Sequence, residues 1–170
     1  MRSNAHVGGH PLHPMLVIIP VGLFIWALVS DIIYLSTGDR VWYDISMYTG
    51  IAAIVTALVE SIPGFIDYFT LPLSKSARSK ATIHMVLNLG IVALCAVAAY
   101  LQWDDGAIAG DEFNIVTALH GIGAVALVVS GWLGGELAYR HHIGMVPDNT
   151  ETIEAQKEDL LTPGPGDRFR

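Results

Sequence analysis

Four long apolar stretches constrain the fold more than any other feature of the sequence. They occupy residues 12–36, 42–69, 81–103 and 113–139. Each is as long as the roughly 20 residues that an α-helix needs to cross a bilayer. Only 15% of the residues are charged, against about 25% in an ordinary soluble domain. We therefore predict an all-α, polytopic membrane protein whose four transmembrane helices form an antiparallel bundle.

Basic residues near the ends of these stretches indicate how the bundle is oriented. The connection between the second and third stretches carries Lys75, Arg78 and Lys80, whereas the connection between the third and fourth carries four acidic residues and no basic one. Because cytoplasmic loops are enriched in Lys and Arg, we expect both termini in the cytoplasm. We expect residues 1–145 to form the membrane domain and the acidic, Pro- and Gly-containing residues 146–170 to form a flexible tail. The net charge of −7 argues against nucleic-acid binding.

Polar and small residues recur at spacings of three and four in three of the stretches. Such spacing places them on one helix face, and polar side chains in a bilayer are expected to face other helices or a cofactor. Close packing of small residues is an alternative explanation, but it accounts poorly for the acids and histidines. The three sets are Ser46, Thr49, Ala53, Thr56, Glu60, Gly64 and Asp67; His84, Asn88, Ile91, Cys95, Ala99 and Gln102; and His120, Ala124, Leu127, Gly131, Gly134, Ala138 and His141.

The segment "HVGGHPLHPMLVIIP" places histidines at the beginning of the first stretch. His10 and His13 each precede a proline, which favours extended backbone at both positions. The predicted topology places both at the membrane level of His84, Asp67 and His141. Histidine is the commonest metal ligand among side chains, so a ligand site at this level is one hypothesis. An interfacial helix cap with histidines as amphipathic filler is the other.

Several acidic residues within or beside the stretches also need a role. Glu60 is near the middle of the membrane and is a functional candidate by default, or a structural partner of a polar group across the bundle. Pro20 in the first stretch removes an intrahelical hydrogen bond. Glu136 and Arg140 are four residues apart and form either a capping ion pair or a clamp that orients a liganding group. We expect Asp31 at the outer interface.

Four motifs together resemble the family called domain of unknown function 2231. They are "GGHPLHPMLV" at 8–17, "GFIDY" at 64–68, His84, and "GGELAYRHHIG" at 134–144. The resemblance implies a four-helix module of the bacterial or archaeal cell (inner) membrane, similar in fold to diheme membrane cytochromes and in some members joined to Rieske or cytochrome c domains. His142 departs from the family pattern, which has glycine there. Carried over by motif, the resemblance implicates His10, His13, Asp67, His84, Glu136, Arg140 and His141.

These observations favour a b-type cytochrome that binds haem b through inward-facing histidines and carries electrons to or from a redox partner or respiratory complex. Axial imidazoles must come from facing elements at one height. His84 would supply one ligand, with His13, His10 or His141 opposite. His120, roughly 12 Å below the outer surface, would be the ligand of a second haem.

Two alternatives remain open from the sequence. One is a non-redox assembly or anchor subunit of a respiratory complex, which would not need the inward polar residues. The other is a non-haem metal or ion site that combines histidines with Asp67 and Glu60. A stand-alone enzyme is less favoured than an electron carrier or subunit, because no nucleophile and base occur at a recognisable spacing.

Overall fold

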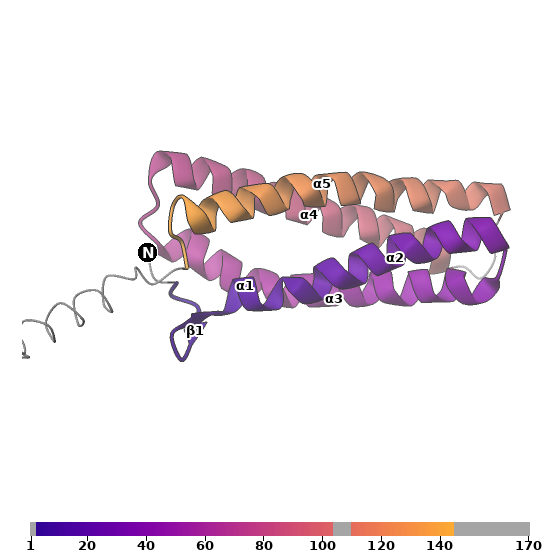
Figure 1. The fold of residues 1–170 in the computed structure, drawn as a ribbon, viewed down its shortest axis with the longest axis horizontal. Helices are drawn as coiled ribbons and strands as arrows, with labels where there is room; N and C mark the ends of the chain where they lie inside the picture. The colour runs from indigo at the N-terminus through magenta and orange to yellow at the C-terminus, as the bar shows by residue number, and fades with distance from the viewer. Residues whose placement is uncertain (1–2, 104–109, 145–170) are drawn as a thin grey trace, which may run out of the picture.

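The computed structural model describes residues 3–103 and 110–144, and it is a bundle of four long helices (Figure 1). Within these residues four helical segments are long and apolar enough to cross a membrane, which confirms the predicted fold class. The predicted tail at 146–170 lies outside the described residues. The elements are β1 (His6–Val7), β2 (His10–Pro11), α1 (Leu12–Leu16), α2 (Ile18–Thr37), α3 (Arg40–Thr70), α4 (Lys75–Trp103), the 3-10 helix η1 (Gly110–Phe113) and α5 (Asn114–Tyr139).

Short connections make successive helices antiparallel. Gly38 ends α2 in the left-handed conformation, with φ 69°, which glycine adopts without steric cost. The Asp39 side chain then caps α3 by accepting a hydrogen bond of 3.0 Å from the Val41 amide. In Figure 1, α2 lies along α3 and α5 lies along α4, so the bundle consists of two helix pairs.

The amino-terminal segment folds back before it enters the bundle. Gly8 and Gly9 have positive φ and form the turn between the paired strands β1 and β2. His10 is extended in β2, as predicted, but the expectation of extended backbone at His13 is wrong because His13 lies inside α1. α1 ends at Leu16, whose carbonyl has no donor four residues later because Pro20 lacks an N–H.

The outer surface of the bundle is apolar on many sides. Val128 and Trp132 are both 74% exposed, and Val125 is 68% exposed. Helices that are hydrophobic all round are typical of membrane spans. Gly131, which we expected on the inward face of α5, is exposed, and the buried positions of α5 include Gly123 and Ser130 instead. The bundle therefore presents apolar side chains to lipid and keeps its polar side chains inside.

Candidate functional site

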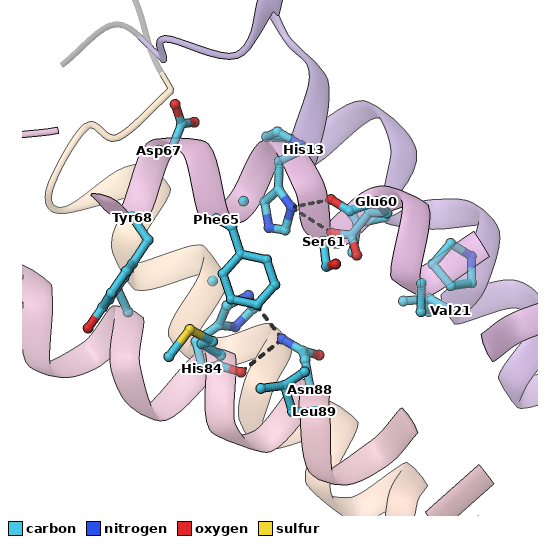
Figure 2. A pocket seen from close by; sticks show the side chains of 18 of the residues that line it. His13, Val21, Glu60, Ser61, Phe65, Asp67, Tyr68, His84, Asn88 and Leu89 are labelled. Carbon is cyan, nitrogen blue, oxygen red and sulfur yellow. Dashed lines mark hydrogen bonds and ion pairs between the residues drawn. The ribbon is translucent and has the colours of Figure 1, made fainter. Parts of the chain in front are cut away.

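His13 and Glu60 form the first pair of the candidate site. His13 Nδ1 lies 2.6 Å from Glu60 Oε1, and Figure 2 shows the two side chains pointing toward each other from α1 and α3. Glu60 is only 9% exposed. Gly64, one turn further along α3, makes room for the ring, because a Cβ there would lie 3.0 Å from His13 Nδ1. The buried Glu60 carboxyl is thus held by a histidine.

His84 is fixed by groups from two helices. Its Nδ1 lies 2.8 Å from the Ser130 carbonyl oxygen and 2.9 Å from Ser130 Oγ. A carbonyl oxygen only accepts hydrogen bonds, so Nδ1 carries the proton and donates it there. His84 Nε2 accepts from the Asn88 amide at 3.1 Å. Gly134 on α5 admits the ring, since a Cβ there would lie 3.2 Å from His84 Cε1.

The two imidazoles lie near each other and line one cavity. Their ring centroids are 6.1 Å apart and their planes are 86° apart. The cavity has a volume of about 210 Å³, and apolar side chains such as Phe24, Ile91 and Leu127 form most of its wall. His13, Glu60, His84 and Asn88 supply polar groups, as the close view of Figure 2 shows. The structure therefore brings two of the predicted ligands together across an apolar cavity.

The other histidines predicted at this membrane level do not line the cavity. His10 is exposed in β2. His141 follows the end of α5 and is half-buried, with an Nε2 that has no hydrogen-bond partner among residues 3–103 and 110–144. Both were expected at the depth of His84, but His10 lies in β2 and His141 beyond the end of α5, and neither is part of the cavity wall. Their roles as ligands remain predictions.

Asp67 fastens the amino-terminal segment to α3. Its carboxylate accepts hydrogen bonds from Ser3 Oγ at 2.6 Å, from the Asn4 amide at 2.8 Å and from the Ala5 amide at 3.3 Å. Nothing in the sequence pattern predicted this partner. By holding the segment that leads through β1 and β2 into α1, Asp67 contributes to the position of His13.

Glu136 is the acceptor for two cations at the end of α5. Arg140 Nη1 lies 3.2 Å from Glu136 Oε1, which is the i,i+4 ion pair expected from the sequence. Lys80 of α4 also bonds to Glu136, a contact that the sequence did not predict. The three side chains join the ends of α4 and α5, and Arg140 is largely exposed.

A second polar cluster lies toward the opposite end of the bundle. His120 Nδ1 lies 2.6 Å from Asp31 Oδ2, and the two side chains are 1% and 0% exposed. Ser46 bonds to the other Asp31 oxygen, and His120 Nε2 lies 3.8 Å from Cys95 Sγ. The expectation of an interfacial Asp31 is therefore wrong. Both nitrogens of His120 have partners, and its role as ligand of a second haem remains a prediction.

The donor geometry bears on the non-haem alternative. Within the described parts of the chain, no three His, Cys, Asp or Glu side chains converge in a way that would hold a metal ion. The two imidazoles that line the cavity, His13 and His84, are in edge-on contact.

A family model described as a predicted membrane protein (DUF2231) matches residues 9–147. The chain belongs to the DUF2231 family. No curated protein and no solved structure matches it. His142 stands where the resemblance to the family predicts glycine. Its φ is 50°, in the left-handed region that favours glycine. The helix-ending turn after α5 is kept although the glycine is not.

Proposed function

We propose that this DUF2231 protein is a membrane b-type cytochrome that binds one haem between His13 and His84 and transfers electrons. The observation that supports the proposal is how each ring is held. His13 Nδ1 is paired with the Glu60 carboxylate and His84 Nδ1 with the Ser130 carbonyl. Metal-ligating histidines almost always donate their other ring nitrogen to a carboxylate or a backbone carbonyl. This arrangement would leave His13 Nε2 for iron, and it would leave His84 Nε2 for iron once Asn88 releases it.

The two rings that would hold the haem also lie close together, with their centroids 6.1 Å apart. Gly64 and Gly134 let the two rings approach from α1 and α4, because a Cβ at either position would crowd the neighbouring imidazole.

The cavity wall is as apolar as a haem would require, but the cavity is smaller than a typical ligand pocket. Ligand pockets are usually about 300–1,000 Å³, whereas this cavity measures about 210 Å³. Asn88 would also have to release His84 Nε2, and it has an alternative in its second hydrogen bond, of 2.9 Å, to the His84 carbonyl. Haem binding therefore requires lining side chains to turn outward while the helices keep their places.

The chain's own residues would orient the rings and keep water out. Bound haem supplies one-electron chemistry. A carboxylate partner raises the basicity of a liganding imidazole, so Glu60 would favour the oxidised iron. Apolar side chains such as Val21 and Leu127 would exclude water. The exclusion of water would also influence the reduction potential of the haem. Electron transfer would then depend on a redox partner or respiratory complex that docks near this end of the bundle.

The basic connection between α3 and α4 supports the proposed orientation. Lys75, Arg78 and Lys80 lie at the bundle end that also contains His13, and the positive-inside rule assigns that end to the cytoplasm of a prokaryotic cell with an inner membrane. Reporter fusions after residue 144 and within residues 104–109 test this orientation. A reporter that is active outside the membrane at residue 144 would contradict it.

Haem content per chain tests the proposed ligands. Protein purified from haem-replete cells is expected to contain one haem, and His84→Ala and His13→Ala are each expected to lose most of it. His6→Gln in the exposed strand β1 is the matched control and should retain haem. Unchanged haem in both cavity variants would contradict the ligand assignment. A folded wild type without haem would favour the assembly or anchor subunit instead.

A further inference from the structure

Asp31, His120 and Cys95 form a line of three polar side chains from three different helices. Asp31 Oδ2 lies 2.6 Å from His120 Nδ1, and His120 Nε2 lies 3.8 Å from Cys95 Sγ. A nucleophile, a base within hydrogen-bond reach of it, and a third group that orients the base make up the arrangement of nucleophilic catalysis. The sequence spacing of these residues gives no sign of this arrangement.

The base is held in place by its surroundings. The Phe24 ring packs edge-on against His120 with centroids 5.6 Å apart. Ser46 bonds to the Asp31 oxygen that does not face His120, and the Gln102 amide lies 3.4 Å from Ser46 Oγ. When a neutral His120 donates Nδ1–H to Asp31 Oδ2, the lone pair of His120 Nε2 faces the thiol.

The thiol borders the same cavity as His84, but at a distance from it. Cys95 lines the cavity wall, whereas His120 and Asp31 do not. Cys95 comes eleven positions after His84 in α4, which corresponds to about 16 Å along a helix. The neighbouring wall includes Phe24, Ala53 and Ile91. A small apolar molecule in the cavity can therefore contact Sγ, and a charged molecule is disfavoured there.

We propose that Cys95 is a nucleophile that adds to lipid-soluble α,β-unsaturated carbonyl compounds, with His120 as general base and Asp31 as its positioning residue. Sγ forms a bond to the β-carbon, and the electron pair of the carbon–carbon double bond moves onto the carbonyl oxygen as an enolate. The thiol proton passes to His120 Nε2. The enolate takes up one proton at its α-carbon and His120 gives one up, so that S–H adds across the double bond. The product is a neutral thioether, with no leaving group and no external oxidant.

The chemical class follows from the cavity and the thiol together. Buried structural cysteines are inert, and Cys95 is 2% exposed with a competing acceptor in the Gly50 carbonyl, 3.4 Å from Sγ. Reaction at Cys95 therefore requires both His120 as base and an electrophile that enters the cavity. An addition needs only the transfer of the thiol proton, which His120 provides. Apolar walls favour an electrophile that partitions into lipid over one that is dissolved in water. The inference concerns the protein without haem, because haem in the proposed site would occupy the same cavity.

Alkylation by N-ethylmaleimide, itself an α,β-unsaturated carbonyl compound, tests the inference. The chain has one cysteine, so the intact mass reports a single adduct, and Cys95→Ser should give none. Protein from cells that lack haem synthesis keeps the cavity free. We expect the folded wild type to react about 100-fold faster than His120→Gln, in line with the contribution of a general base. Asp31→Asn should also be slower, and His6→Gln should match the wild type.

A second thiol position separates activation from access. In the variant Cys95→Ser/Val92→Cys the thiol lines the same cavity without the His120 contact, and we expect it to react about 100-fold more slowly than Cys95. A charged methanethiosulfonate should react slowly with every folded variant, so fast reaction identifies a variant that has unfolded. Equal maleimide rates for Cys95 and for position 92, or labelling of the wild type only after denaturation, would overturn the proposal.

Discussion

His120 and Asp31 form a hydrogen-bonded pair, 2.6 Å from Nδ1 to Oδ2, in a part of the bundle where neither side chain is more than 1% exposed. A buried acid–base pair stabilises a fold only when both members are present, because each satisfies the other. Removing only one of the two side chains should therefore lower the stability of the fold strongly.

Removing one member of this pair should destabilise the protein strongly. Asp31→Ala leaves His120 without its acceptor, and the loss of one partner of a buried pair costs about 3–5 kcal/mol. The double variant Asp31→Leu/His120→Leu should be less destabilised than Asp31→Ala, since no unpaired polar group remains. Thermal unfolding in detergent measures both. If Asp31→Ala has the same melting temperature as the wild type, the pair contributes nothing to stability.

Gly123 should be the least tolerant glycine of α5. A Cβ at this position would lie 2.6 Å from Phe24 Cζ, so Gly123→Ala forces Phe24 away from His120 and should cost about 1–3 kcal/mol. Gly121→Ala is the matched control, because nothing lies within 4 Å of its Cβ and alanine favours a helix by about 0.5–1 kcal/mol. Thermal unfolding should separate the two variants, and equal melting temperatures would argue against the close contact.

Asp67→Ala should release the amino-terminal segment. The amides of Asn4 and Ala5 then lose their acceptor, and hydrogen exchange measured by mass spectrometry should speed up at residues 3–7. Exchange in α4 should stay unchanged, which serves as an internal control. Protection at Asn4 that persists in Asp67→Ala would show that the segment is held by other contacts.

Glu60→Ala should weaken haem binding without removing a ligand. Glu60 holds His13 Nδ1 at 2.6 Å, and loss of such a partner typically costs about 10–100-fold in metal affinity. Titration of haem into the haem-free protein, followed by absorbance, gives the Kd. Glu136→Ala, which changes a carboxylate that does not line the cavity, is the control. Equal affinities of Glu60→Ala and the wild type would contradict the proposed role of Glu60.

The sequence predicted the helices well. Length and apolar content determine whether a segment can span a bilayer, and the spans agree with those expected to within a few residues at most ends. The rise per residue gives depth, which is why His13 and His84 were expected at one level. The start of α4 at Lys75 is earlier than the predicted residue 81, because polar residues continue this helix beyond its apolar part.

The direction in which each residue faces could not be predicted equally well. His10 and His141 were expected at the level of His84, but they lie in β2 and beyond the end of α5 and do not line the cavity. Depth estimated from the sequence also does not determine the position of a residue around the bundle. For the same reason the contact between Asp31 and His120 was missed. Asp31 is six residues before the end of α2 and His120 six after the start of α5. These matching depths were the available signal, but contact between them depends on the rotation of each helix about its axis.

A reduced-minus-oxidised visible spectrum of the purified wild-type protein, with haem quantified per chain, tests the central claim most directly. Two imidazole ligands on one haem predict sharp Soret and α bands at a stoichiometry of one haem per chain, and loss of these bands in His84→Ala. A featureless spectrum from folded protein made in haem-replete cells would contradict the assignment of His13 and His84 as axial ligands.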